Sequence, residues 1–384
     1  MKADVYTKYG YIKGSNLLFA VILNLLALDI PSFAGPYRPI EPLPLNIVDM
    51  HCHVAGIGAG NSGCFVSQRL RDSWRFKIYL RAYGVSQNEL KEKGDDLVTD
   101  RISQLIAQSK YVNKAVLLAL DGVVKTDGSL DINRTEIYVP NEFVVNAVTK
   151  HSNLLFGASV NPYRKDALGR LDCAKAHGAV LVKWIPSIMR IDPSDQRLQP
   201  FYRKLVELNL PLLTHAGKER SFSSSADEFC DPEKLRLPLK MGVKVIAAHI
   251  ASTGEYHGER SSERLARLMR QYPNLYSDIS SLTQINKHFY LKEALTQPEY
   301  EGRLLYGSDF PLINTALVSP WYYCLTLSPK QLFTISKTKN PWDADVLLKH
   351  NLGTPTEIFV RSGQLLFQDS SEKPVAVSRA NTWD

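Results

Sequence analysis

The chain has 384 residues, of which 44% are hydrophobic and 22% are charged, values close to those of an ordinary globular protein. This composition excludes wholesale disorder, and 22 glycines with 21 prolines are too few for a collagen-like or low-complexity chain. The formal net charge is +7, but the basic residues are scattered, so no stripe or module predicts nucleic-acid binding. Five cysteines without a close CxxC pair argue against a disulfide framework and against a zinc ribbon.

The N-terminal residues have the pattern of an export signal followed by a linker. Lysines precede an apolar run over residues 17–28, and Ser32 and Ala34 then stand in the small-x-small spacing of a signal-peptidase site. The run is short for a membrane span of about 20 residues. We therefore predict a signal peptide over residues 1–34, or an uncleaved N-terminal anchor as the alternative, and a Pro-rich linker over 35–45. The expected location is periplasmic or secreted, with the cytoplasm as the alternative, and the only expected membrane contact is this segment if it stays uncleaved.

From residue 46 onward, short β-rich runs alternate with helix-like segments. The runs are apolar on both faces, which is typical of strands with helices on one side and a packed interior on the other. They occupy residues 47–51, 115–121, 154–161, 179–185, 210–215, 243–249, 275–279 and 304–309. Eight strands alternating with helices predict an α/β fold, a (β/α)8 TIM barrel over residues 46–365 with a C-terminal tail over 366–384. A doubly wound sheet is the alternative, but no GxGxxG follows an early strand.

One connection is longer than the others, since about sixty residues separate the first two strands. This insertion lies at the end of the barrel where lids and specificity loops are built. It contains a glycine-rich segment over 56–63, which predicts a mobile loop, and a helical segment over 95–110. Between them, residues 69–81 carry five basic side chains among aromatic ones, which predicts either a solvated helix or a patch that attracts an anionic substrate.

Ionisable side chains stand at the carboxyl ends of the predicted strands, where a TIM barrel assembles its chemistry. His51 and His53 end the first strand, and their i, i+2 spacing puts both on one face, so both can reach one metal ion. Cys52 should then point to the opposite face and serve packing. Later strands carry or end in Lys183, His215, His249 and Asp309. Imidazole and carboxylate groups are good ligands for zinc and its divalent neighbours.

The residues around these positions form motifs in a fixed order. They are VDMHCH at 48–53, VKWIP at 182–186, PLLTHAG at 211–217, AHIA at 248–251 and YGSDFP at 306–311. Together they resemble the amidohydrolase superfamily, most closely its amidohydrolase-2 branch of barrel hydrolases and decarboxylases. HxH alone is a weak signal, but HxH, Lys, His, His and Gly-Ser-Asp in sequence is a specific one.

The resemblance implies a divalent metal, most simply zinc, held by His51, His53 and Asp309 together with His215. Two arrangements stay open. In a binuclear site a carboxylated Lys183 bridges two ions, and His215 and His249 hold the second one. In a mononuclear site His215 completes the single ligand set and His249 stays free for catalysis.

The resemblance also implies a hydrolase that acts on an amide, lactone or ester-like bond of a small molecule through metal-activated water. Asp309 would accept and return the proton, and His249 would polarise the substrate. The alternative within enzymes is a metal-dependent decarboxylase of an aromatic or unsaturated carboxylic acid. The alternative of another class is a catalytically silent binding protein on a barrel scaffold. The expected partner is a small, anionic substrate, and a homo-oligomer is compatible with the sequence.

Three further residues are weaker substrate-binding candidates: Asp278 near the end of the seventh strand, His257 after the sixth, and Arg164 after the third. For each of them the competing interpretation is a rim or surface residue without a role in binding.

Overall fold

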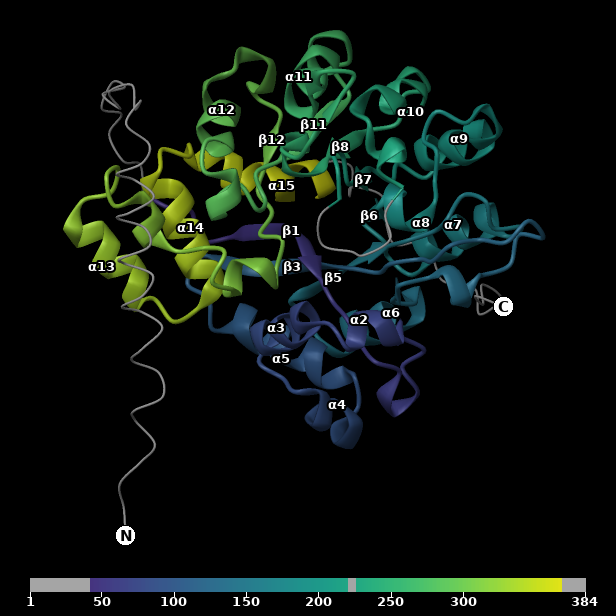
Figure 1. Ribbon diagram of the computed structural model, residues 1–384, viewed down its shortest axis with the longest axis horizontal. Helices are drawn as coiled ribbons and strands as arrows, with labels where there is room; N and C mark the ends of the chain where they lie inside the picture. Colours follow the sequence, from purple (N-terminus) through teal and green to yellow (C-terminus); the bar gives the residue numbers. More distant parts are fainter. Residues whose placement is uncertain (1–41, 220–225, 368–384) are drawn as a thin grey trace.

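Eight parallel strands form the centre of the computed structural model, which describes residues 42–219 and 226–367 (Figure 1). In sheet order they are β1 (Ile47–His53), β3 (Val112–Leu118), β5 (Leu154–Ala158), β6 (Leu181–Trp184), β7 (Leu212–Thr214), β8 (Val245–Ala247), β11 (Leu275–Asp278) and β12 (Leu304–Leu305). Beyond β12 the chain returns to β1, where His53 N donates to Phe310 O at 2.9 Å and Asp309 N donates to His51 O at 2.8 Å. These bonds close the sheet into a barrel.

Helices follow the strands and surround the barrel (Figure 1). They include α5 (Asp96–Ala107), α6 (Asn141–Lys150), α7 (Ala167–Ala176), α9 (Gln199–Glu207), α10 (Arg236–Lys240), α11 (Ser261–Gln271), α12 (Tyr290–Thr296), α13 (Pro329–Lys337) and α14 (Pro341–Asn351). This alternation confirms the predicted TIM barrel, and all eight predicted strands are present in the predicted order.

The strand side chains separate into two apolar layers. Inward-facing residues such as Val48, Met50, Val116 and Leu213 form the barrel interior, and the larger layer lies between the strands and the helices. The last helix, α15 (Thr356–Phe367), adds Leu365 to the interior cluster, and its Arg361 donates to Leu304 O at 2.7 Å. Because β12 begins at Leu304, α15 covers the amino ends of the strands and leaves the carboxyl ends for a site.

The insertion after β1 contains η1 (Ala59–Asn61), β2 (Phe65–Val66), α2 (Gln68–Arg71), α3 (Trp74–Tyr83), α4 (Gln87–Lys93) and α5. In Figure 1 helices α2 to α5 lie together on one side of the barrel. The glycine-rich segment is not the free loop that its composition predicted, because the buried Asp95 carboxylate accepts hydrogen bonds from Ile57 N, Gly58 N, Ala59 N and Ser62 Oγ at 2.5–3.1 Å. A carboxylate with several backbone donors is a strong local tether.

The basic residues that follow form the predicted solvated helices. Arg69, Arg75, Lys77 and Arg81 are exposed on α2 and α3. Arg71 instead donates to the carbonyls of Ile57 and Val66 at 2.7 and 2.9 Å and so ties α2 to the loop. That this surface attracts an anionic substrate stays a prediction.

Most of the two ends of the chain falls outside the described residues. The predicted signal segment and much of the linker lie in residues 1–41, and the predicted tail lies almost wholly in residues 368–384. Export and the N-terminal anchor therefore stay predictions. Within residues 42–219 and 226–367, no helix combines the length and the apolar composition that a membrane crossing requires.

Candidate metal centre

A β-bulge in β1 turns both motif histidines toward the barrel axis. The register pairs Asp49 with Ala115 and Cys52 with Leu117, so β1 has one residue more than β3 in this interval. Regular alternation from the inward-facing Met50 would send His51 outward, and the extra residue reverses this for the rest of the strand. Cys52 accordingly lies in the outer apolar layer, which confirms that it serves packing.

Three ligand atoms converge at the end of β1. His51 Nε2 and His53 Nε2 lie 3.1 Å apart, and Asp309 Oδ1 lies 3.7 and 3.3 Å from them. Atoms that bind a tetrahedral zinc ion at 2.0–2.1 Å are about 3.4 Å from one another. The spacing of these three atoms therefore fits one divalent ion.

His215 and His249 face the same centre from β7 and β8. The rings of His51 and His249 stack at 5.0 Å, and His249 Nε2 lies 3.8 Å from Asp309 Oδ2. His215 Nε2 is buried and has no hydrogen-bond partner among the described residues; the nearest carboxylate oxygen, Oε2 of Glu219, is 3.5 Å away. A buried, unbonded imidazole nitrogen beside three convergent ligands is the kind of atom that a metal ion satisfies.

Lys183 lies beneath these histidines. Its side chain is almost completely buried, and its Nζ lies 2.9 Å from His51 Nε2. Burial lowers the pKa of this lysine to about 8, against the opposing influence of Asp278, Asp309 and Glu219. A neutral amine is the form that can react to a carbamate, so the position and the lowered pKa are compatible with both nuclearities.

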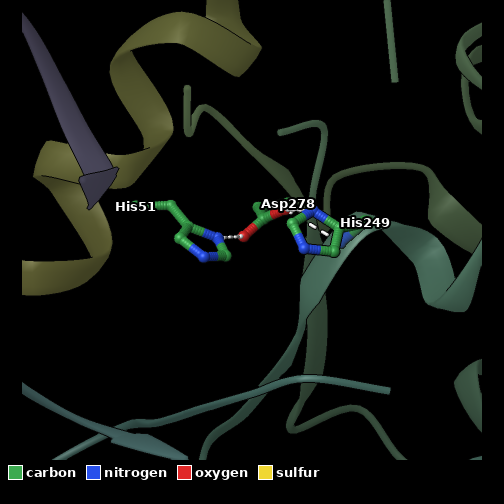
Figure 2. A group of neighbouring side chains, drawn as sticks. All are labelled: His51, His249 and Asp278. Atoms are coloured by element: carbon green, nitrogen blue, oxygen red, sulfur yellow. Dashed lines mark hydrogen bonds and ion pairs between the residues drawn. The ribbon is translucent and has the colours of Figure 1, made fainter. Parts of the chain in front are cut away.

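Asp278, at the end of β11, contacts both of the stacked histidines, His51 and His249. Figure 2 shows its carboxylate directed at both rings, with one oxygen toward His51 and the other toward His249. Oδ2 lies 2.8 Å from His51 Nδ1, and Oδ1 accepts from His249 N at 2.9 Å. Ser280 Oγ adds contacts to Nδ1 of His51 at 3.1 Å and of His249 at 2.7 Å.

These contacts show which ring nitrogen of His51 carries the proton. A carboxylate only accepts, so Nδ1 of His51 carries the proton, and Nε2 presents a lone pair toward His53 and Asp309. Ligand atoms of His51, His249 and Asp278 also lie close enough together for one ion, but the Asp278 carboxylate already accepts hydrogen bonds from these donors. Asp278 therefore orients the histidines, and its role in substrate binding stays a prediction.

The backbone around the site adopts left-handed conformations that nonglycine residues seldom take. His249, Ile250 and Ala251 have φ values of 56°, 48° and 51°, and Asp309 has 63°. The turn at 249–251 is held by Asp278 and by Ser277 Oγ, which accepts from Ile250 N at 3.0 Å. Gly307 is required for close approach, because a Cβ there would lie 2.8 Å from Cβ of His51.

The site keeps its ligands in the forms that bind metal ions. Burial lowers the pKa of His53 to about 4 and lowers those of His215 and His249. Burial raises the pKa of Asp309, but His249, His53 and His51 outweigh this and hold it well below its usual range. Neutral imidazoles and an ionised carboxylate are therefore present near neutral pH.

The remaining weak candidates do not join this cluster. Arg164 pairs with Asp121 through bonds of 2.7 and 2.6 Å, and both side chains are buried. His257 lies in the exposed turn between β9 (Glu255–Tyr256) and β10 (Glu259–Arg260). Two surface cavities, of about 440 and 220 Å3, open at the amino ends of the strands and contain none of the candidate residues.

Two residues near the site were not predicted. Glu219 lies beside His215, and Lys287 is buried in η7 (Ile285–Lys287) after β11. Neither belongs to a motif strand, so only their spacing of four residues from His215 and nine from Asp278 could have pointed to them.

The sequence model of the amidohydrolase family matches residues 116–330, which is more than half of the chain. The chain belongs to the amidohydrolase family. This confirms the resemblance drawn from the motifs, and with it that the protein is a member of an enzyme superfamily. No curated protein matches this amidohydrolase.

Several solved structures resemble the amidohydrolase at low identity. Amidohydrolase 2 from Bifidobacterium longum subsp. infantis is 13% identical over 84% of this chain and 99% of its own, with a TM-score of 0.46. A probable 2-pyrone-4,6-dicarboxylic acid hydrolase from Acinetobacter baumannii, with citric acid bound, is 15% identical over 84% of this chain and 99% of its own, with a TM-score of 0.48. The 5-carboxyvanillate decarboxylase of Novosphingobium aromaticivorans, in complex with manganese and a nitrobenzoic acid, is 12% identical over 85% of this chain and 99% of its own, with a TM-score of 0.44. Such likenesses extend to the barrel architecture and no further.

Proposed function

We propose that the protein is a metal-dependent hydrolase that cleaves an amide, lactone or ester-like bond of a small molecule. The observation that carries this proposal is the convergence of His51 Nε2, His53 Nε2 and Asp309 Oδ1 at 3.1–3.7 Å in a member of the amidohydrolase family. The unbonded His215 Nε2 supports it as a fourth ligand atom.

Zinc is the ion that we propose for this set, because two or three imidazoles and one carboxylate are typical zinc ligands. A bound divalent ion would lower the pKa of a coordinated water toward 7 and supply hydroxide at neutral pH. A single ion would be held by His51, His53, Asp309 and His215, and His249 would stay free. A second ion would be held by His215 and His249, with Lys183 as a further ligand if it is carboxylated.

The chain's own groups then divide the remaining work. Asp309 is oriented by a hydrogen bond from Ser281 Oγ, to which Gln284 Nε2 donates at 2.9 Å. This bond supports the proposed role of Asp309, in which its carboxylate would accept a proton from the attacking water and return it to the leaving group. His249, held through Nδ1 by Ser280, directs Nε2 toward the same space and can polarise the scissile carbonyl.

The test is metal analysis and activity of the purified protein together with His53→Ala. We expect bound divalent metal and turnover of a lactone, amide or ester panel in the wild-type protein, and loss of both in the variant with the fold retained. His257→Ala is the matched control, because this histidine is exposed and makes none of the contacts described for the cluster. Wild-type protein that takes up no divalent metal contradicts the proposal and favours a silent binding protein.

Product analysis separates hydrolysis from decarboxylation. Hydrolysis yields a new carboxylate from the cleaved bond, whereas decarboxylation releases carbon dioxide from an existing one. Turnover that releases carbon dioxide stoichiometrically would replace the hydrolase proposal by the decarboxylase alternative.

Reconstitution with zinc decides between the two nuclearities. If Lys183 is carboxylated, added bicarbonate raises the activity and the metal content reaches two ions per chain. One ion per chain without bicarbonate dependence assigns His249 to catalysis.

A further inference from the structure

Glu219 places a carboxylate beside the buried ring nitrogen of His215. Its Oε2 lies 3.5 Å from His215 Nε2, and both side chains are buried, with exposed fractions of 6% for Glu219 and 10% for His215. Among residues 42–219 and 226–367, His215 Nε2 has no hydrogen-bond partner. The two atoms are therefore close neighbours without a hydrogen bond between them.

A salt bridge between these side chains is the competing interpretation. Burial lowers the pKa of His215, against the opposing influence of Glu219, so the imidazole is neutral near neutral pH. A neutral ring with its proton on Nε2 would donate to the carboxylate at about 2.7–3.2 Å. The observed distance is longer, which indicates that Nε2 presents a lone pair to the space that the carboxylate oxygen also faces.

The spacing of the two atoms fits two ligands of one metal ion. Ligand atoms about 2.0–2.1 Å from a tetrahedral zinc ion are about 3.4 Å from one another. His53 Nε2 and Asp309 Oδ1 in the metal centre lie 3.3 Å apart, and the pair of His215 and Glu219 lies 3.5 Å apart. An imidazole lone pair and a carboxylate that face each other away from water become a favourable arrangement when a cation lies between them.

The backbone around Glu219 is fixed in a tight turn after β7. Glu219 N donates to Asp227 Oδ1 at 3.1 Å, and Lys218 N donates to Thr253 O at 3.0 Å. Gly217 has a φ of 85°, and a Cβ there would lie 2.6 Å from Thr253 O, so the turn requires glycine. These bonds hold the backbone of Glu219 at the carboxyl end of the barrel before a ligand is bound, as a preorganised ligand residue requires.

We propose that Glu219 is a further metal ligand, whose Oε2 binds the same divalent ion as His215 Nε2. The inference rests on the proposed function, which supplies the ion. Glu219 brings to this ion the negative charge that a carboxylated Lys183 would otherwise contribute. Lys183 then needs no carboxylation, and two ions per chain are compatible with an activity that does not depend on bicarbonate.

The first measurement is the zinc affinity of Glu219→Gln, obtained by competition with a chromophoric chelator. Glutamine keeps the size of the side chain and removes its charge. We expect at least about 10-fold weaker zinc binding, because even the loss of a group that only supports a ligand costs this much. Glu255→Gln is the matched control, since it removes the same charge from an exposed position in β9, and it should bind zinc as the wild-type protein does.

The second measurement separates a ligand from a residue that only positions His215. In a crystal structure of the zinc-loaded wild-type protein, we expect Glu219 Oε2 at about 2.0–2.2 Å from the ion that His215 Nε2 binds. A residue that only positioned His215 would weaken zinc binding when it is changed, but its oxygens would lie outside bonding distance of the ion. A carboxyl group on Lys183 in the same structure would overturn the statement that none is needed.

The inference is overturned if Oε2 lies outside bonding distance of the zinc ion or if Glu219→Gln binds zinc as tightly as the wild-type protein. Urea denaturation of the metal-free variant separates weaker binding from loss of the fold, and if the variant does not fold, the wild-type crystal structure decides. Zinc on His51, His53 and Asp309 with Glu219 elsewhere removes the role of Glu219 alone. Wild-type protein without zinc removes the metal-dependent hydrolase and this ligand with it.

Discussion

Two buried polar clusters lie on either side of the segment 307–309, and they differ in the kinds of atoms that face one another. The support cluster, on the helix side, consists of Asp49, Tyr306, Trp342, Asp345 and Lys349. Trp342 Nε1 donates to Asp49 Oδ2 at 2.7 Å, and Tyr306 OH and Lys349 Nζ donate to Asp345 Oδ2 at 3.0 and 2.7 Å. The metal centre, on the interior side, has instead two imidazole nitrogens 3.1 Å apart and an unbonded His215 Nε2.

The difference separates groups that stabilise the fold from groups that await a ligand. In the support cluster, oppositely charged and complementary atoms face each other, so removing one leaves its partner buried without a bond. In the metal centre, several acceptor atoms face one another, an arrangement that becomes favourable only when a cation lies between them. Changes in the first cluster should therefore reduce stability, and changes in the second should reduce binding.

The largest effect is expected from Lys349→Met. This change leaves the Asp345 carboxylate buried without its cation, and burial already raises the pKa of that group. We expect the free energy of unfolding to fall by about 3–5 kcal/mol, measured by urea denaturation of metal-free protein. The exposed control Lys330→Met should change it by less than about 0.5 kcal/mol. An equally small effect of Lys349→Met would mean that the support cluster does not stabilise the fold.

Asp278→Asn should weaken the metal centre more than the fold. The Asn side chain is uncharged, so Nδ1 of His51 loses its bond to a carboxylate, which is the group that directs Nε2 to the metal. Loss of such a supporting carboxylate typically lowers metal affinity 10- to 100-fold, or about 1.4–2.7 kcal/mol. Competition with a chromophoric chelator measures it. Unchanged affinity would show that Asp278 does not orient His51.

His215→Leu should leave the stability of the metal-free protein within about 1 kcal/mol of wild type. The substitution removes a buried nitrogen that has no bond to lose and keeps a similar volume. With zinc present the two proteins should separate, because ligand binding stabilises only the protein that binds it. Thermal denaturation with and without a chelator tests both statements, and a large loss in the metal-free state would assign His215 to the fold.

The sequence predicted the barrel and its strand ends well, because apolar runs and motif residues are local features. All eight strands, the shared face of His51 and His53, and the outward Cys52 were predictable in this way. The last strand was predicted to reach Asp309 but ends at Leu305, because Gly307 must pass close to His51 and Asp309 takes a left-handed conformation.

Long-range partners were not predictable from one sequence. The loop tether at Asp95 joins residues that lie 33–38 positions apart, and the contact between Asp278 and His51 spans 227 positions. Lys287 carries no motif, and only the fold shows that it is buried. Arg164 was a binding candidate by position, whereas Asp121 gives it a structural partner.

The smallest effect is expected where a pair is largely in water. Asp195 accepts from Arg197 Nη2 at 2.6 Å and from Tyr163 OH at 2.9 Å, and Arg197 foremost lowers the pKa of Asp195 to about 2. A carboxyl group with a lowered folded-state pKa stabilises the protein above its unfolded pKa of about 3.9, and this contribution is lost as the pH falls toward 2. Because the Arg197 side chain is 79% exposed, the contribution should be below about 1 kcal/mol. The stability difference between the wild-type protein and Asp195→Asn, measured by urea denaturation, should thus be small at pH 6 and smaller still at pH 3. A difference that grows on acidification would contradict the assigned direction of the pKa, and one above about 2 kcal/mol at pH 6 would place this pair with the support cluster.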